Sequence, residues 1–336
     1  MTIKVSIDAS GGDFGFSVTI NAGINALSTY DDLLINFVGD KTEIEKELNN
    51  NPLSSKFAKR IVITHASEVI SMDDSPSVAL RHKKDSSMRV AINLVKSGEV
   101  DACVSAGNTG ALMSIARFVL KTIKGVDRPA IMSAVPTYTG PTHVLDLGAN
   151  IDSKPGTLLQ FAIMGSIAVQ NTESIDRPSV GLLNIGSEEL KGNTVIKNTY
   201  QDLSKLESSL FEFKGYVEGN NIMSGEVNVI IADGFTGNIA LKTAEGTANF
   251  ITSELKKALT GDLLGKISSL LNIKNINYFK KKLDPRMYNG ANLLGLNSPV
   301  VKSHGGTDFV GFANAISVCE KIIKGQLIDK IKANIN

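Results

Sequence analysis

Short apolar segments rich in β-branched residues alternate with segments of helical spacing along almost the whole chain. The strand-like segments are 3–8, 33–39, 60–66, 102–106, 130–135, 143–147, 180–186 and 227–233. Continuous apolar strands that alternate with helices are typical of a mostly parallel sheet whose two faces are both covered. The alternation therefore predicts an α/β fold.

Helices are expected between these strands. The segments with helical spacing are 17–28, 42–48, 77–97, 156–170 and 193–208, and further helices are expected to begin near 109, near 236 and after 308. We expect Thr42 to cap the second of these helices, and we expect one long helix within 77–97. With 336 residues, 42% of them hydrophobic and 21% charged, the chain suits one large or two medium globular domains.

Composition argues against several classes of protein. No apolar run reaches the roughly 18 residues of a membrane span, and residues 1–10 are typical of a first strand rather than a signal peptide. The net charge of +1 argues against a nucleic-acid partner. Cys103 and Cys319 lie in apolar stretches and are expected to be buried. The histidines are scattered, so we expect no metal site. We therefore expect a cytoplasmic protein.

Six polar turns are rich in the same residue types, namely Gly, Asn, Asp, Ser, Thr and Lys. They are ASGGD (9–13), AGNTGA (106–111), GANIDSKPG (148–156), GSEELKGN (186–193), DGFTGN (233–238) and KSHGGTD (302–308). Any one of them can be an ordinary capped turn. Ligands of open α/β sheets bind at the carboxyl ends of the strands, where helix N-termini attract phosphate. Six such turns on one sheet edge predict a site for a small anion, with added charge from Lys154, Lys191, Lys242 and Lys302.

Other well-known sites are missing from the sequence. It has no G-x-G-x-x-G after a strand, no G-x-x-x-x-G-K-[ST] and no G-x-S-x-G. A standard dinucleotide site, a P-loop and a nucleophile elbow are therefore not expected, and neither is any cofactor.

Nine stretches resemble, in order, the bacterial phosphate acyltransferase family, the acyl-(acyl-carrier-protein):phosphate acyltransferases of phospholipid synthesis. They are DASGGD (8–13), ALRHKKDSSM (79–88), SAGNTGALM (105–113), DRPA (127–130), DLGANIDSKP (146–155), LLNIGSEELKGN (182–193), DGFTGNIALKTAEG (233–246), LDPRMYNGANLLGLN (283–297) and KSHGGTDFVGFANAI (302–316). Ser10 stands where the family usually has Met, and Gly306 where Ser is common. Neither difference removes a charged group.

The resemblance implies a Rossmann-like α/β/α sandwich, similar to the isocitrate/isopropylmalate dehydrogenase and phosphotransacetylase type. It implies a single catalytic domain over 1–336 with two lobes and a protruding helical tip. It also implies reversible transfer of a long-chain acyl group from acyl-acyl-carrier-protein to inorganic phosphate, whose product passes to a membrane glycerol-3-phosphate acyltransferase. The family forms homodimers and associates peripherally with the membrane.

The turns and the resemblance together predict the site residues. The predicted catalytic set is Lys191, Asn238, Lys242 and His304. The predicted substrate and phosphate-binding set is Asp8, Gly12, Asp13, Gly107, Asn108, Thr109, Gly110, Asp146, Asn150, Lys154, Asn193 and Asp233. Candidate donors for the oxyanion are the backbone N–H groups of 107–110 and the amides of Asn108 and Asn238. Several of the aspartates are equally well explained as helix caps. Without an activated Ser or Cys, we expect direct transfer and no covalent acyl-enzyme.

A basic segment stands out near the C-terminal third. Residues 256–286 hold eight of the 35 basic residues and two of the 34 acidic ones, a net charge of +6. One helical face carries Leu263, Leu264, Ile267, Leu270 and Leu271. A basic amphipathic helix is typical of a membrane surface, although a dimer or core helix has the same pattern. We predict a membrane-contacting tip at about 252–285.

Three other functions remain open from the sequence. A dehydrogenase on a similar fold would bind a nicotinamide, and a phosphotransacetylase would use a short acyl-CoA. A non-enzymatic membrane scaffold would need none of the polar turns. The basic residues of 79–88 either face an acidic carrier protein or form a solvated helix face.

Overall fold

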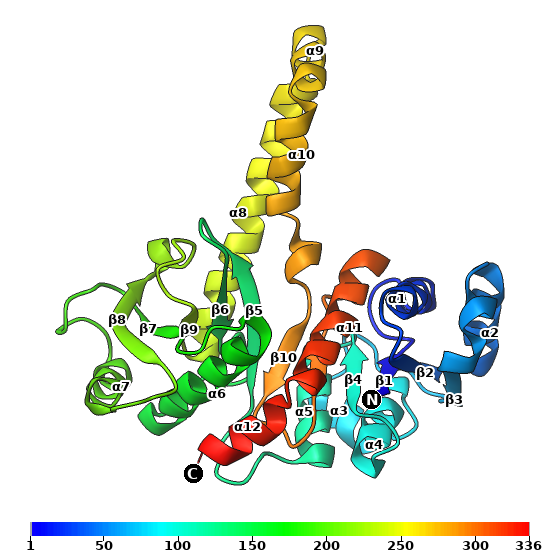
Figure 1. The fold of residues 1–336 in the computed structure, drawn as a ribbon, viewed down its shortest axis with the longest axis horizontal. Helices are drawn as coiled ribbons and strands as arrows, with labels where there is room; N and C mark the ends of the chain where they lie inside the picture. The colour runs from blue at the N-terminus through cyan, green and yellow to red at the C-terminus, as the bar shows by residue number, and fades with distance from the viewer. Residues whose placement is uncertain (1, 336) are drawn as a thin grey trace.

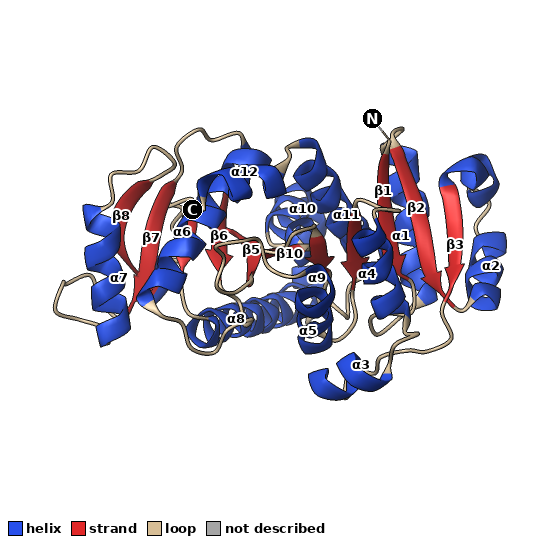
Figure 2. Ribbon diagram, turned by 90° about the horizontal axis from the view of Figure 1, so that it is seen from below, coloured by secondary structure: helices blue, strands red, loops and turns tan. Residues whose placement is uncertain are grey.

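A single eleven-stranded sheet runs through the molecule. It is seen in a computed structural model that describes residues 2–335, and its strand order is β3-β2-β1-β4-β11-β10-β5-β6-β9-β7-β8. The strands are β1 Ile3–Asp8, β2 Leu33–Gly39, β3 Ile61–His65, β4 Ala102–Ser105, β5 Ala130–Pro136, β6 Pro141–Leu145, β7 Ser179–Asn184, β8 Glu212–Glu218, β9 Val229–Ile231, β10 Ala291–Leu294 and β11 Val300–Lys302. Figure 2 shows helices on both sides of these strands, as the alternation predicted.

The helices connect the strands and also form a projection from the body. They are α1 Phe16–Thr29, α2 Lys41–Asn50, α3 Pro76–His82, α4 Ser87–Ser97, α5 Thr109–Leu120, α6 Pro155–Glu173, α7 Thr194–Lys205, α8 Gly234–Thr260, α9 Leu263–Leu271, α10 Ile273–Lys282, α11 Phe309–Lys324 and α12 Leu327–Asn334. One apolar cluster, which includes residues of α1, α6, α11 and α12, contains strand residues from both halves of the sheet. A second cluster joins α4 and α5 to β4.

The sheet consists of two parallel halves joined by antiparallel strands. Strands β3, β2, β1, β4 and β11 run parallel to one another, and so do β6, β9, β7 and β8. Between the halves, β10 is antiparallel to both β11 and β5, and β5 forms an antiparallel pair with β6. The mostly parallel sheet is confirmed. The antiparallel centre was not predicted, and neither were strands β8, β10 and β11.

Two helix predictions are wrong in detail. The helix expected within 77–97 is two helices, because Ser86 caps α4 by accepting a hydrogen bond from Arg89 N at 3.3 Å. Asp85, just before the cap, accepts hydrogen bonds from the backbone and hydroxyl of Ser67. The cap of α2 is Asp40, which accepts from Glu43 N, and Thr42 lies inside the helix.

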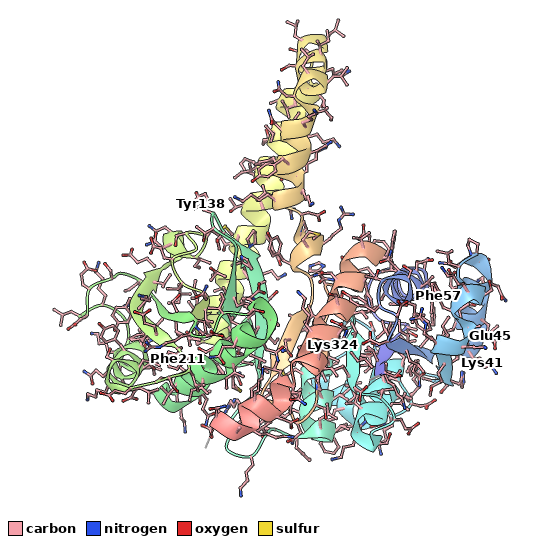
Figure 3. The ribbon with its side chains drawn as sticks, in the orientation of Figure 1. Lys41, Glu45, Phe57, Tyr138, Phe211 and Lys324 are labelled. Atoms are coloured by element: carbon pink, nitrogen blue, oxygen red, sulfur yellow. The ribbon has the colours of Figure 1, made fainter. Side chains whose placement is uncertain are left out.

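Residues 246–282 form a stalk that projects from the body (Figure 1). It contains the distal part of α8, followed by α9 and α10. Helix α8 has 27 residues and is therefore about 40 Å long. Its only buried residues are Gly234 and Gly237, at its first turn, and α9 and α10 bury none. Figure 3 shows side chains standing out along the stalk, with Tyr138 near its base. Within residues 2–335, none of the helices combines the length and the hydropathy needed to span a bilayer.

Candidate active site

The turns after β1, β4 and β11 meet at one place. These three strands are adjacent and parallel, so their carboxyl ends coincide. The Asp13 N–H donates to Gly305 O at 3.0 Å, which joins the first turn to the third. Gly12 has a φ of 91°, and a Cβ there would lie 2.9 Å from the Ala106 Cβ. The close approach of the turns therefore requires glycine at this position.

Lys302 lies at the centre of these turns. Its side chain is 9% exposed, and its Nζ donates to Ala106 O at 3.1 Å and also to Ser303 O. Burial lowers the pKa of Lys302 to about 8. The carboxylates of Asp8 and Asp13 oppose this shift, and the ammonium of Lys242 adds to it. Lys242 of α8 is therefore near enough to act on the same site.

Sequence reasoning counted Lys302 among four candidate cations but left it out of the predicted site sets. A lysine at the end of the apolar strand PVVK was the available signal, because a buried strand that ends in a charge places that charge at the sheet edge.

The sequence predicted that Asp8 contacts the substrate, and the structure places its side chain beneath the turns. Its carboxylate accepts hydrogen bonds from Ser87 Oγ and Ser105 Oγ, both at 2.6 Å. Ser105 Oγ accepts in turn from Gly107 N at 3.1 Å. Burial raises the pKa of Asp8, while both serine hydrogen bonds act to lower it. Asp8 therefore shapes the turn that contains Gly107.

The N-terminus of α5 presents backbone donors. Asn108 accepts from Ala111 N at 3.0 Å, and its Nδ2 donates to Met72 O and Asp74 O. Both N–H donors of its side chain are used in these loop contacts, so the side chain has no spare donor for an oxyanion. The N–H groups of Thr109 and Gly110 are the first of the helix, and no acceptor contacts them within residues 2–335. These two donors fit an anion.

A second pair of turns, after β6 and β9, is organised by Asp146. Its carboxylate accepts from the backbone N–H groups of Ile131, Ala149 and Asn150 at 2.9, 3.1 and 2.7 Å. The Asn150 Nδ2 donates to Asp146 and to Pro129 O. Asp146 and Asn150 are buried, so they hold the turn from beneath. Both side chains therefore make contacts within the protein, and their contact with substrate stays a prediction.

The first turns of α8 bring two predicted residues together. Asp233 caps the helix by accepting from Thr236 N at 2.8 Å. Asn238 Nδ2 donates to Leu147 O at 3.0 Å, which ties α8 to the Asp146 turn. Lys242 lies one turn further along and is exposed, with its Nζ 2.7 Å from Glu245. Asn238 and Lys242 therefore share one helix face.

For the predicted site residues Lys191 and Lys154, the structure shows no hydrogen bond or ion pair to the other polar turns within residues 2–335. Lys191 pairs with Glu188 of its own turn at 2.9 Å, and Asn193 caps α7 by accepting from Ile196 N. Within residues 2–335, the hydrogen bonds and ion pairs of residues 185–193 stay within 184–197. This turn therefore makes no contact of that kind with the other turns. Lys154 is exposed at the cap position of α6 without a side-chain capping bond.

His304 lies in the third turn beside Lys302. Its backbone N–H donates to Asn289 Oδ1 at 2.8 Å, and its ring Nδ1 accepts from Gly306 N at 3.1 Å. Because Nδ1 accepts, the proton of the neutral ring lies on Nε2. The ring is exposed, and Nε2–H can serve as a hydrogen-bond donor.

Comparison with known proteins identifies a family match and similar chains. Residues 3–330 match the family described as fatty acid synthesis protein. The chain is 55% identical over all of its length to the phosphate acyltransferase of Ruthia magnifica subsp. Calyptogena magnifica, covering 98% of that protein. It is 51% identical to the phosphate acyltransferase of Pelagibacter ubique (strain HTCC1062), with 99% of this chain and 98% of that protein covered.

Solved structures of low identity share the fold. A phosphotransacetylase from Streptococcus pyogenes superposes with a TM-score of 0.62 at 16% identity, covering 98% of this chain and 94% of that one. The EutD phosphotransacetylase from Staphylococcus aureus gives 0.59 at 16% identity, covering 97% and 94%. The full-length identity to the named relatives is the stronger finding, and the chain belongs to the phosphate acyltransferase family.

Proposed function

We propose that this chain transfers a long-chain acyl group from acyl-acyl-carrier-protein to inorganic phosphate, to give acyl phosphate for phospholipid synthesis. The observation that carries the proposal is the meeting of three strand-end turns around the buried Lys302, with Lys242 close enough to influence its charge. The two cations and the free N–H groups of Thr109 and Gly110 together suit a phosphate dianion.

Direct attack by phosphate fits the side chains at the site. Burial raises the pKa of both Cys103 and Cys319, so neither supplies a thiolate nucleophile. Phosphate is itself anionic near neutral pH, and holding it beside the thioester carbonyl can supply several kcal/mol. The carbonyl oxygen becomes an oxyanion, for which Asn238 and the Nε2–H of His304 are the proposed donors.

The proposed function is tested by the product. Purified protein with palmitoyl-carrier protein and phosphate should form an acyl phosphate, trapped as a hydroxamate, only when both substrates are present. Single-turnover mixing without phosphate should leave no acyl group on the protein. A trapped acyl-enzyme would contradict direct transfer, and product formed only from a short acyl-CoA would favour the phosphotransacetylase alternative.

We also propose that the enzyme acts in the cytoplasm as a homodimer that touches the membrane through its stalk. The side chains of Leu263, Leu264, Leu270 and Leu271 are between 72% and 81% exposed. Lys280, Lys281 and Lys282 lie in the last turn of α10. Exposed leucines at the tip of a stalk that carries basic residues suit an anionic bilayer surface. The nearly unburied length of α8 supports a second copy of the chain beside it.

Replacing Leu263 with Glu should abolish co-sedimentation with anionic vesicles, because a charge would then enter the apolar contact. The matched control is Leu53→Glu, which changes a 51%-exposed leucine on the body and should sediment like the unchanged protein. Unchanged sedimentation of Leu263→Glu would exclude this part of the stalk as the membrane contact.

The proposed fold type is a single catalytic domain with two lobes, of the isocitrate/isopropylmalate dehydrogenase kind. A putative 4-hydroxythreonine-4-phosphate dehydrogenase from Salmonella typhimurium superposes with a TM-score of 0.54 at 12% identity, covering 96% of this chain. That likeness and the two parallel halves of the sheet support the assignment.

A further inference from the structure

We propose that Lys302 is the acid that protonates the leaving thiolate, an inference that rests on the proposed acyl transfer. Lys302 is the last residue of β11, paired in register with Ser105 of β4 and with Ala291 of β10. Both neighbouring strands hold it in place, so its side chain starts from a rigid part of the sheet. A proton donor built on a strand is positioned more sharply than one on a loop.

The ammonium group is oriented by the turns themselves. Nζ donates to the carbonyls of Ala106 and Ser303, which belong to the turns after β4 and β11. These bonds use two of its three N–H donors. No acceptor contacts the third donor within residues 2–335. One N–H is therefore available to a group bound among the turns.

The surrounding charges suit proton exchange with a thiol. The carboxylates of Asp8 and Asp13 act to raise the pKa of the Lys302 ammonium, and the Lys242 ammonium acts to lower it. Together with burial, these charges place the pKa of Lys302 at about 8. A free thiol has a pKa of roughly 8.5. Proton transfer between groups of similar pKa is nearly balanced, which favours reaction in both directions.

His304 is less suited to this step. Its Nδ1 accepts a hydrogen bond from Gly306 N–H, an arrangement that a second ring proton would break. The Nε2–H of His304 remains suited to hydrogen bonding of the oxyanion, and Lys302 to proton donation.

The step balances without a further reactant. An oxygen of the phosphate dianion forms a bond to the thioester carbonyl carbon, and the C–S bond breaks. The departing sulfur takes a proton from the Lys302 ammonium. The resulting neutral amine then takes the proton from the hydroxyl of the new acyl phosphate. The products are the acyl phosphate dianion and a neutral thiol, and Lys302 is again charged.

The test uses two donors with the same acyl chain, an alkyl thioester of pantetheine and an aryl thioester of thiophenol. The aryl thiolate leaves without a proton, so it does not need the acid. Lys302→Met and Lys302→Arg should lose about 100-fold or more with the alkyl thioester. With the aryl thioester at saturating phosphate, Lys302→Arg should lose less than about 10-fold, because it keeps the charge that helps to hold phosphate. Arginine keeps the charge without releasing a proton, so it separates proton donation from charge alone.

An equal loss with both donors would show that Lys302 only positions the turns and would overturn the proposal. The unchanged enzyme provides a second readout if the variants do not fold. At saturating phosphate, its rate with the alkyl thioester should fall as the pH rises through about 8, where the ammonium is lost, and its rate with the aryl thioester should not. If the rates with the two donors had the same pH dependence, the role of Lys302 as the acid would also be overturned. Palmitoyl-carrier protein, itself an alkyl thioester, serves as the reference donor in both readouts. No acyl phosphate from it would instead refute the proposed function, and the role of Lys302 with it.

Discussion

Replacing Asp146 with Ala should lower the free energy of unfolding by about 3–5 kcal/mol. The carboxylate is fully buried and accepts hydrogen bonds from three backbone N–H groups, those of Ile131, Ala149 and Asn150. Alanine would leave these donors in the interior without an acceptor. Each unsatisfied buried donor costs about 1–3 kcal/mol. The loss should appear as a lower midpoint in urea unfolding.

The matched control for this change is Asp233→Ala. Asp233 is also an aspartate that follows a strand, but it caps α8 at a half-buried position, with Thr236 N as its backbone donor. Loss of a helix cap costs about 1 kcal/mol. If the two variants unfolded at the same urea concentration, the Asp146 turn would not depend on its buried carboxylate.

Replacing Lys242 with Ala should lower kcat/KM for phosphate by about 100-fold. Its cation acts on the same site as Lys302, where the charge of the reacting phosphate must be held. The exposed pair that it forms with Glu245 contributes little to stability, so the variant should fold normally. Steady-state kinetics with varied phosphate measure the effect.

Lys257→Ala is the matched control. Lys257 lies on the same helix and forms the same kind of pair, with Glu254 at 2.6 Å, but it stands in the stalk. We expect its kcat/KM to stay within about twofold of the unchanged enzyme. With the alkyl thioester, Lys242→Ala should also shift the fall in rate to a higher pH, because Lys242 lowers the pKa of Lys302. Equal kinetics for the two variants would remove Lys242 from the site.

Local patterns in the sequence predicted most of the elements and several of their caps. Asn108, Asn193 and Asp233 all cap helices through hydrogen bonds to a residue three positions on. Such contacts depend on neighbours along the chain, so the turn sequences indicate them. The capping alternative noted for these residues is what the structure shows. The helix within 77–97 was predicted as one, because its break depends on Asp85 and its contacts with Ser67, 18 residues away.

The sequence by itself determined the α/β alternation, five of the six strands that carry the polar turns and the basic amphipathic segment, because periodicity and turn chemistry act over short distances. Only the tertiary structure decided which polar groups are buried. In the sequence, Asp8, Asp146 and Lys302 resemble polar residues that are exposed. In the structure all three are buried: Asp8 and Asp146 support the turns from beneath, and burial lowers the pKa of Lys302. The antiparallel strands at the centre of the sheet and the local contacts of Lys191 were also decided there. Burial and strand direction depend on which distant segments pack together, and no local pattern encodes that.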